Sequence, residues 1–271
     1  MNQFSLANKV VVVTGAAGLL GKNHLHAIVR AGGEPVLIDI DKLRLQSVVK
    51  EFKETYKLDL AHFVIDITDE HQVKTCCVNI LLKFGHIDGL VNNAANNPKI
   101  EANGVNEQSR LENFSIKNWQ ADISVGLTGA FLCTKYFGTA IAKQGGSIVN
   151  ISSDLGLIAP DQRLYEKPGL APDNQPVKPV TYSVVKTGLI GLTRYTATYW
   201  AKQGVRCNSL CPGGVENSQE TSFVAKLTSP IPLGRMAKQS EYQGSLVFLL
   251  SDASSYMTGT ELTADGGRTA W

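Results

Sequence analysis

The sequence predicts a three-layer, doubly wound α/β fold with a mostly parallel sheet of seven strands. Short, almost continuously apolar runs alternate with longer helical patterns, and such strands are typical of parallel sheets that helices cover on both faces. The 271 residues are 43% apolar and 18% charged, so the chain can bury a sizeable core. We therefore expect one domain over residues 1–271.

The expected elements follow one another in a regular order. Strands are predicted at residues 9–14, 35–39, 62–66, 87–94, 146–153, 205–214 and about 260–264. Helices are predicted between them at residues 18–32, 41–57, 69–84, 115–143, 182–202 and 239–251. Residues 154–180 show neither period and hold half of the ten prolines. Because long loops in compact domains are usually functional or disordered, we expect an insertion at about 154–180.

Composition excludes several classes of partner. A net charge of +2 gives no electrostatic footprint for nucleic acid. No stretch approaches the ~20 apolar residues of a membrane helix, so we expect a cytoplasmic protein without a membrane partner. The five cysteines have neither disulfide-framework nor zinc-like spacing, and we expect reduced, buried thiols and no metal.

A glycine-rich turn, "TGAAGLLG" at residues 14–21, directly follows the first strand. Between a strand and a helix, such a turn lets the backbone approach a pyrophosphate, and the helix N-terminus supplies N–H groups. The sequence therefore predicts a dinucleotide site of the Rossmann type. The residues expected to contact the cofactor here are Gly15, Ala17, Gly18, Leu19, Leu20 and Gly21.

Asp39 ends the second strand, 18 residues after Gly21. A carboxylate at this position can accept hydrogen bonds from ribose hydroxyls and would repel a 2′-phosphate. No arginine directly follows Asp39, since the next residues are Ile40, Asp41 and Lys42. We therefore favour NAD over NADP. The alternative is that Asp39 only caps the next helix.

Tyr182 and Lys186 are four residues apart in "YSVVK". This spacing places both side chains on one helix face, which is either a catalytic pair or an ordinary surface pair. The motif alone does not decide between the two.

An ordered set of motifs decides it. Four motifs lie at the carboxyl ends of predicted strands, namely "DIT" (66–68), "NNAA" (92–95), "IVNISS" (148–153) and "CPGGV" (211–215), and "YSVVK" (182–186) starts the helix that comes after the fifth strand. Ligands bind at this edge of such sheets. The set resembles the short-chain dehydrogenase/reductase family, in its single-domain branch, over nearly the whole chain.

The resemblance implies roles for three residues. Tyr182 would be the catalytic acid and base, and Ser153 would orient the substrate oxygen. Lys186 would hold the nicotinamide ribose and lower the phenol pKa. A free phenol titrates near pH ~10, so catalysis near neutrality requires such a decrease.

The resemblance also implies further cofactor contacts. Asp66 and Ile67 match the adenine contacts, and Asn217 stands in the nicotinamide loop where many relatives have threonine. The remaining expected contacts are Ile40, Asn93, Ala94, Ala95, Ile151, Pro212, Gly213 and Val215, together with Tyr182 and Lys186.

Two positions depart from the family pattern. Gly18 sits one place early and Leu19 occupies the usual glycine position, which leaves the backbone path of the turn open. Gly126 stands where the family has an asparagine that anchors a water for proton relay. A water, Ser124 or another residue would take its place, or proton transfer would be slower.

The third departure is the insertion itself, which separates Ser153 from Tyr182 and should cover the substrate. Its side chains are polar, which predicts a polar substrate, although a solvated loop is the alternative. The segment resembles flagellin-modification and gluconate-type sugar oxidoreductases. The expected substrate contacts are Ser153, Arg163, Tyr165 and Gly214.

We therefore expect an NAD-dependent enzyme that interconverts a secondary alcohol and a ketone, on a sugar, amino-sugar or sugar-acid derivative. The alternatives are a 3-oxoacyl-carrier or steroid-type reductase, and a catalytically weak dinucleotide-binding regulatory protein. The resemblance implies a homotetramer or homodimer built through helices near 127–143 and 182–202, with Trp271 also packing against a neighbour.

Overall fold

Seven strands form one sheet in the computed structural model, which describes residues 2–96 and 108–271. Their order is β3-β2-β1-β4-β5-β6-β7, and every pair is parallel, where the sequence predicted a mostly parallel sheet. The order reverses between β1 and β4, so the binding crevice is expected above the carboxyl ends of these two strands. The strands are β1 (Val10–Thr14), β2 (Glu34–Asp39), β3 (His62–Val64), β4 (Gly89–Asn92), β5 (Gly146–Ile151), β6 (Val205–Pro212) and β7 (Glu261–Ala264).

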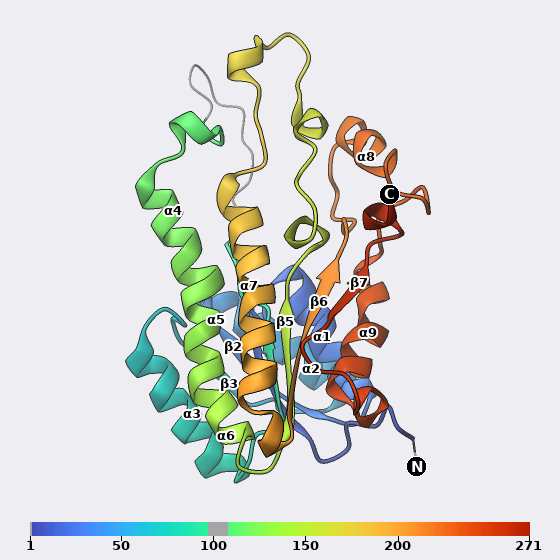
Figure 1. Cartoon of the computed structure of the whole chain (residues 1–271). Helices are drawn as coiled ribbons and strands as arrows, with labels where there is room; N and C mark the ends of the chain where they lie inside the picture. Colours follow the sequence, from blue (N-terminus) through green and yellow to red (C-terminus); the bar gives the residue numbers. More distant parts are fainter. Residues whose placement is uncertain (1, 97–107) are drawn as a thin grey trace.

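Helices cover both faces of the sheet (Figure 1). On one face lie α1 (Leu19–Arg30), α2 (Lys42–Tyr56) and α9 (Gln243–Leu250). On the other lie α3 (Glu70–Phe84), a long helix from Ile116 to Ile141, and α7 (Val180–Tyr199). Strand β1 shows the reason, because Val11 and Val13 join one core cluster while Val10 and Val12 join the other. Both faces of β1 are therefore apolar, as the continuous valine run predicted.

The long helix contains two π-helical turns that the sequence pattern did not predict. Its segments are α4 (Ile116–Ile123), η2 (Ser124–Thr128), α5 (Gly129–Cys133), η3 (Thr134–Gly138) and α6 (Thr139–Ile141), with η2 and η3 in the π form. Such turns are frequent at functional sites. The first of them holds Gly126, which faces α7.

The insertion is ordered by three short 3₁₀ turns, η4 (Asp154–Gly156), η5 (Gln162–Tyr165) and η6 (Pro172–Asn174). It rises above the carboxyl edge of the sheet, beside α8 (Thr221–Thr228) (Figure 1). The sequence did not predict α8, which has only about two turns. Its apolar side chains pack on the insertion, in a cluster formed by the buried Leu164, Leu227 and Met236 and the partly buried Tyr165, Phe223 and Val224.

No helix in the described ranges combines the length and apolar character that a bilayer span requires.

Candidate active site

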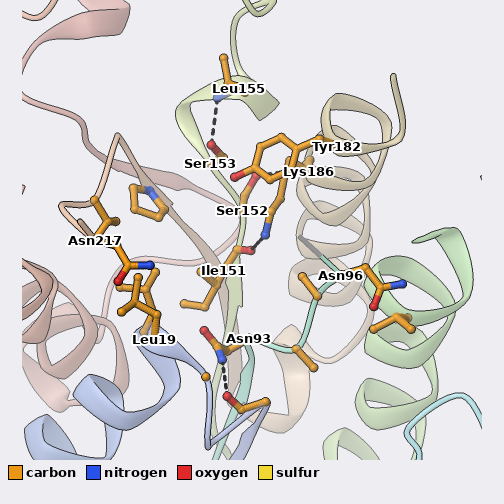
Figure 2. Close-up of a pocket in the computed structure, with 18 of the residues that line it drawn as sticks. Leu19, Asn93, Asn96, Ile151, Ser152, Ser153, Leu155, Tyr182, Lys186 and Asn217 are labelled. Atoms are coloured by element: carbon orange, nitrogen blue, oxygen red, sulfur yellow. Dashed lines mark hydrogen bonds between the residues drawn. The ribbon is translucent and has the colours of Figure 1, made fainter. Parts of the chain in front are cut away.

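A cavity of about 700 Å³ opens above the carboxyl ends of the strands. Its lining comes from the glycine turn, the ends of β2, β4 and β5, the start of α7, the loop after β6 and the C-terminal turn. Figure 2 shows part of this lining, including Leu19, Asn93, Ile151, Ser153, Tyr182, Lys186 and Asn217. Most of the residues expected from the sequence are brought together here. They are Gly15, Ala17, Gly18, Leu19, Leu20, Asp39, Ile40, Asp66, Ile67, Asn93, Ala94, Ala95, Ile151, Ser153, Tyr165, Tyr182, Lys186, Pro212, Gly213, Gly214, Val215 and Asn217.

The glycine turn has a defined backbone path. Gly15 has a φ of +61°, and a Cβ there would lie 2.8 Å from the Cα of Ala94. Gly18 is the extended N-cap of α1, and no side chain caps the helix at this position. The shifted spacing therefore still leaves the first-turn N–H groups of α1 open to an anion. Gly21 does not line the cavity; a Cβ there would collide with the carbonyl oxygen of Gly15.

Asn93 fixes this turn against the end of β4. Its side-chain amide donates to the carbonyl oxygens of Thr14 and Gly15, both at 3.0 Å (Figure 2). The Thr14 hydroxyl accepts from the backbone N–H groups of Asn93 at 3.1 Å and Ala94 at 3.2 Å. Asn93 therefore positions the turn through hydrogen bonds within the protein.

The Asp39 carboxylate faces the glycine turn. One oxygen accepts from the backbone N–H of Ala17 and the other from that of Asp41, both at 2.9 Å. Asp41, not Asp39, caps α2, by accepting from the backbone N–H of Arg44 at 3.0 Å. The capping alternative for Asp39 is therefore wrong. Arg44, which the sequence analysis did not consider, also lines the cavity and pairs with Asp41 at 3.2 Å.

The residues on this side of the cavity fit a dinucleotide. A glycine turn with close backbone contacts, an uncapped helix N-terminus and a strand-end carboxylate provide places for a pyrophosphate and a ribose. Beyond them, Asp66 holds its own turn by accepting from the backbone N–H and the hydroxyl of Thr68, both at 2.8 Å. Ile67 is buried beside Asp66 and Ile40 is exposed at the rim.

Tyr182 and Lys186 lie one turn apart on α7, next to the end of β5 (Figure 2). The Lys186 ammonium donates to the carbonyl oxygen of Ile151 at 2.8 Å, and the Ser152 hydroxyl donates to the carbonyl oxygen of Lys186 at 2.7 Å. These two bonds fix the register of α7 against β5. The Lys186 ammonium lies 5.8 Å from the centre of the Tyr182 ring.

The protein alone does not lower the Tyr182 pKa. Burial raises it above the usual value, a hydrogen bond with Ser153 opposes this, and the charge of Asp154 raises it further. Burial also lowers the pKa of Lys186 to about 8, with the neighbouring ammonium of Lys178 acting in the same direction. The expectation that Lys186 itself lowers the phenol pKa is therefore not met by the protein groups alone.

Asp154, next to Ser153, forms a buried ion pair that the sequence analysis missed. The Ser153 hydroxyl donates to Asp154 Oδ1 at 2.7 Å, and Arg268 Nη1 donates to Oδ2 at 2.8 Å. The two charged side chains are only 4% and 7% exposed. The pair could not be predicted from a local sequence motif, because Asp154 and Arg268 are 114 residues apart.

Val185 fills the space in front of Gly126. A Cβ on Gly126 would lie 2.5 Å from Val185 Cγ1, so the packing of Val185 on this helix requires a residue without a side chain at position 126. Beside them is a cavity of about 10 Å³, roughly the room of one water, whose lining includes Asn96, Asp122 and Tyr182. Ser124, one of the substitutes considered for the missing asparagine, lines neither cavity.

Arg163 is not placed in the cavity. Its guanidinium donates twice to Asp161 at 2.8 Å, and its side chain is 83% exposed. The expectation that Arg163 contacts the substrate is therefore corrected. The cavity instead contains residues that the sequence analysis did not single out for this role, namely Asp154, Leu155, Lys178, Phe223, Leu227, Met236 and Arg268.

Comparison with known protein families gives two matches along the chain. Residues 9–165 match the short chain dehydrogenase family, and residues 172–269 match the family described as enoyl-(acyl carrier protein) reductase.

Three curated relatives match over nearly the full length. A 3-oxoacyl-[acyl-carrier-protein] reductase of Thermotoga maritima is 34% identical over 97% of this chain and 98% of its own. A trans-4-hydroxycyclohexanecarboxylate dehydrogenase of Sinomonas cyclohexanicum is 32% identical over 98% of this chain and 94% of its own. The post-translational flagellin modification protein A of Campylobacter coli is 28% identical, over 97% and 98%.

Solved structures show the same architecture. A short-chain type dehydrogenase/reductase from Mycobacterium marinum superposes with a TM-score of 0.84 at 26% identity, covering 100% of this chain and 98% of its own. A gluconate 5-dehydrogenase from Burkholderia cenocepacia, solved with NADP and tartrate, superposes with a TM-score of 0.83 at 25% identity, covering 100% of this chain and 98% of its own.

Proposed function

Because the chain belongs to the short-chain dehydrogenase/reductase family of oxidoreductases, we propose that it is an NAD-dependent enzyme that interconverts a secondary alcohol and a ketone on a sugar, amino-sugar or sugar-acid derivative. The observation that carries this proposal is one cavity with Asp39 at one end and Ser153, Tyr182 and Lys186 at the other. A dinucleotide spanning the cavity would bring its nicotinamide to Tyr182.

In the proposed mechanism the protein moves one proton. The nicotinamide, when bound, supplies or accepts the hydride. Tyr182 takes the hydroxyl proton of the alcohol in oxidation and returns it in reduction. Ser153 would hold the substrate oxygen beside the phenol, and Lys186, whose ammonium donates to the carbonyl oxygen of Ile151, would hold the cofactor ribose. Asn93 keeps the phosphate turn in place.

The preference for NAD rests on the acidic end of the cavity. Asp39 and Asp41 both line the cavity, where their carboxylates would repel a 2′-phosphate, and Asp41 already pairs with Arg44. Arg44 could otherwise bind such a phosphate, and the related gluconate 5-dehydrogenase was solved with NADP. We expect kcat/KM to be higher with NAD than with NADP, and Asp39→Ser to reduce the ratio.

Support for the substrate class comes from the relatives and from the lining. The names of two relatives specify hydroxy acids, gluconate and trans-4-hydroxycyclohexanecarboxylate. One wall of the cavity is apolar, formed by Phe223, Leu227 and Met236. This wall favours a second candidate, a hydroxylated carbocyclic acid, whose ring would pack on it.

The remaining alternatives are a 3-oxoacyl-carrier or steroid-type reductase, and a catalytically weak dinucleotide-binding protein. The first has a relative in the Thermotoga enzyme, but Asp39 opposes NADPH. The second alternative, a catalytically weak protein, rests on Gly126, which stands in place of the family's relay asparagine. Tight NADH binding without turnover on any substrate would favour it.

The test is NADH formation from NAD, with NADP in parallel, on D-gluconate, D-glucitol, 4-hydroxycyclohexanecarboxylate, 4-methylcyclohexanol, amino sugars and a 3-hydroxyacyl thioester. Tyr182→Phe is the control and should lose roughly 10²- to 10⁴-fold in kcat while binding NADH as the wild type does. Normal turnover by this variant would contradict the catalytic assignment, and activity on the thioester alone would contradict the substrate class.

A further inference from the structure

Lys178 brings a positive charge to the reacting end of the cavity. It precedes α7 and lines the cavity. Its backbone N–H donates to Gln162 Oε1 at 2.8 Å, which links the end of the insertion to η5. Its ammonium lies 3.8 Å above the centre of the Tyr182 ring, closer than the ammonium of Lys186 at 5.8 Å.

The other cations that the described part of the chain places near the reacting end are already engaged. Lys186 donates to the Ile151 carbonyl oxygen, and Arg268 pairs with Asp154. Arg163 lies outside the cavity on Asp161. Within residues 2–96 and 108–271, the Lys178 ammonium has no salt bridge and no hydrogen-bond acceptor, only the face of the Tyr182 ring.

An unpaired ammonium in this position is costly. Burial lowers the Lys178 pKa to about 8, although the charge of Asp154 acts in the opposite direction. Asp154 does not pair with Lys178; its carboxylate accepts instead from the Ser153 hydroxyl, the Leu155 backbone N–H and Arg268. With a pKa of about 8, the Lys178 ammonium still carries charge at neutral pH. An ion pair with an incoming anion would offset the cost of having removed this ammonium from water.

We propose, building on the function proposed above, that the substrate carries a carboxylate and that the Lys178 ammonium binds it while Tyr182 acts on a hydroxyl a few carbon atoms away. A carboxylate is a small anion that fits one ammonium in a partly apolar cavity. Because the Lys178 ammonium lies 3.8 Å from the centre of the Tyr182 ring, the carboxylate and the reacting hydroxyl must be close together, which favours a small hydroxy acid or its oxo acid. Neutral polyols and long acyl thioesters lack this anchor.

The experiment compares matched acids and neutral compounds in the wild type, Lys178→Met and Lys178→Arg. The pairs are D-gluconate with D-glucitol and 4-hydroxycyclohexanecarboxylate with 4-methylcyclohexanol. We expect the wild type to prefer the acid of a pair. In Lys178→Met, KM for the acid should rise roughly 10- to 100-fold with a smaller effect on kcat. Arginine should restore much of the affinity, and Arg163→Gln, which removes an exposed cation of the same insertion, should change nothing.

Several outcomes would overturn the inference. Equal kcat/KM for acid and neutral partners, unchanged by Lys178→Met, would remove the anchor and leave the proposed function standing. A loss of kcat on both members of a pair would mean that Lys178 acts on Tyr182 rather than on the substrate. If no compound turns over, the proposed function fails, and calorimetric titration of the NADH complex with D-gluconate still decides, since the same affinity in wild type and Lys178→Met contradicts the inference.

Discussion

Tyr182 determines how pH changes the rate in each direction. Burial raises its pKa above the usual phenol value, so the phenol is protonated at neutral pH. Alcohol oxidation needs a proton acceptor, and its rate should therefore increase as pH rises toward the phenol pKa. Ketone reduction needs the protonated phenol, and its rate should decrease over the same range.

Initial rates in both directions between about pH 6 and 10 test this expectation. Lys186 and Lys178 titrate in the same range, each with a pKa of about 8, so Lys178→Met separates the change in substrate affinity from the change in proton transfer. Oxidation that slows steadily above neutrality in both proteins would contradict the assignment of Tyr182 as the base.

Residue-scale prediction from sequence succeeded where a residue belongs to a local motif. Gly15, Asp39 and the Tyr182–Lys186 pair lie in short patterns attached to strand ends, and they line one cavity. Lys178 and Arg268 belong to no such pattern. Their positions depend on how the insertion and the C-terminal turn fold back over the sheet, which local sequence does not encode.

Among the elements, the contact between η2 and α7 explains why an asparagine is absent. A side chain at Gly126 would enter the space of Val185, which follows Tyr182 by three residues on α7. The family's relay side chain and this valine are therefore mutually exclusive in this packing.

We expect Gly126→Asn to destabilise the protein by about 1–3 kcal/mol through overpacking. Adding Val185→Ala should recover most of that loss, because it removes the atoms in conflict. Urea denaturation of the two single variants and the double variant measures the coupling. Additive single effects, with no recovery in the double variant, would show that the two positions do not compete for space.

A second link between elements joins the loop after β5 to the C-terminal turn, through Asp154 and Arg268. Arg268→Met leaves the buried carboxylate without its cation. We expect a loss of about 3–5 kcal/mol in the free energy of unfolding, since a single buried charge is worse than a pair. Arg268→Met combined with Asp154→Leu should be less destabilised than Arg268→Met alone. Equal stability of Arg268→Met and wild type would contradict the importance of the pair.

For the whole molecule, the surface of the helical layer that contains α7 suggests association. Tyr195 and Tyr199 stack on one another with rings 5.7 Å apart, yet they are 66% and 61% exposed, and Phe131 on α5 is also half exposed. Exposed aromatic groups of this kind are enriched at protein interfaces. We propose that this layer forms the contact of a homodimer or homotetramer.

Sedimentation velocity of the wild type and of Tyr195→Glu/Tyr199→Glu tests this proposal. The wild type should sediment as an oligomer and the double variant as a smaller species with the same secondary structure by circular dichroism. Leu43→Glu, which changes an exposed side chain on α2, serves as the matched control. A monomeric wild type would contradict the proposal.

For the whole molecule, the sequence predicted the sheet well, but it predicted the segments above the carboxyl ends of the strands poorly. The apolar runs predicted all seven strands, most clearly β1, β2, β4, β5 and β6, which are buried almost throughout, whereas the edge strands β3 and β7 are partly exposed. Helix α8 and the 3₁₀ turn η5 of the insertion are short and stabilise one another by contact. Neither segment has a sequence pattern that predicts it alone, so the part of the cavity lining that they form could not be predicted from the sequence.

The contact between the insertion and α8 also has a consequence for protein engineering. Leu164 and Tyr165 pack on Phe223 and Leu227, and the Lys226 ammonium donates to the carbonyl oxygen of Glu166 at 2.7 Å. A chimera that takes only one of these segments from a relative would expose the apolar face of the other. Transplants that aim to change substrate preference should therefore exchange residues 154–180 and the α8 region together, as one cassette.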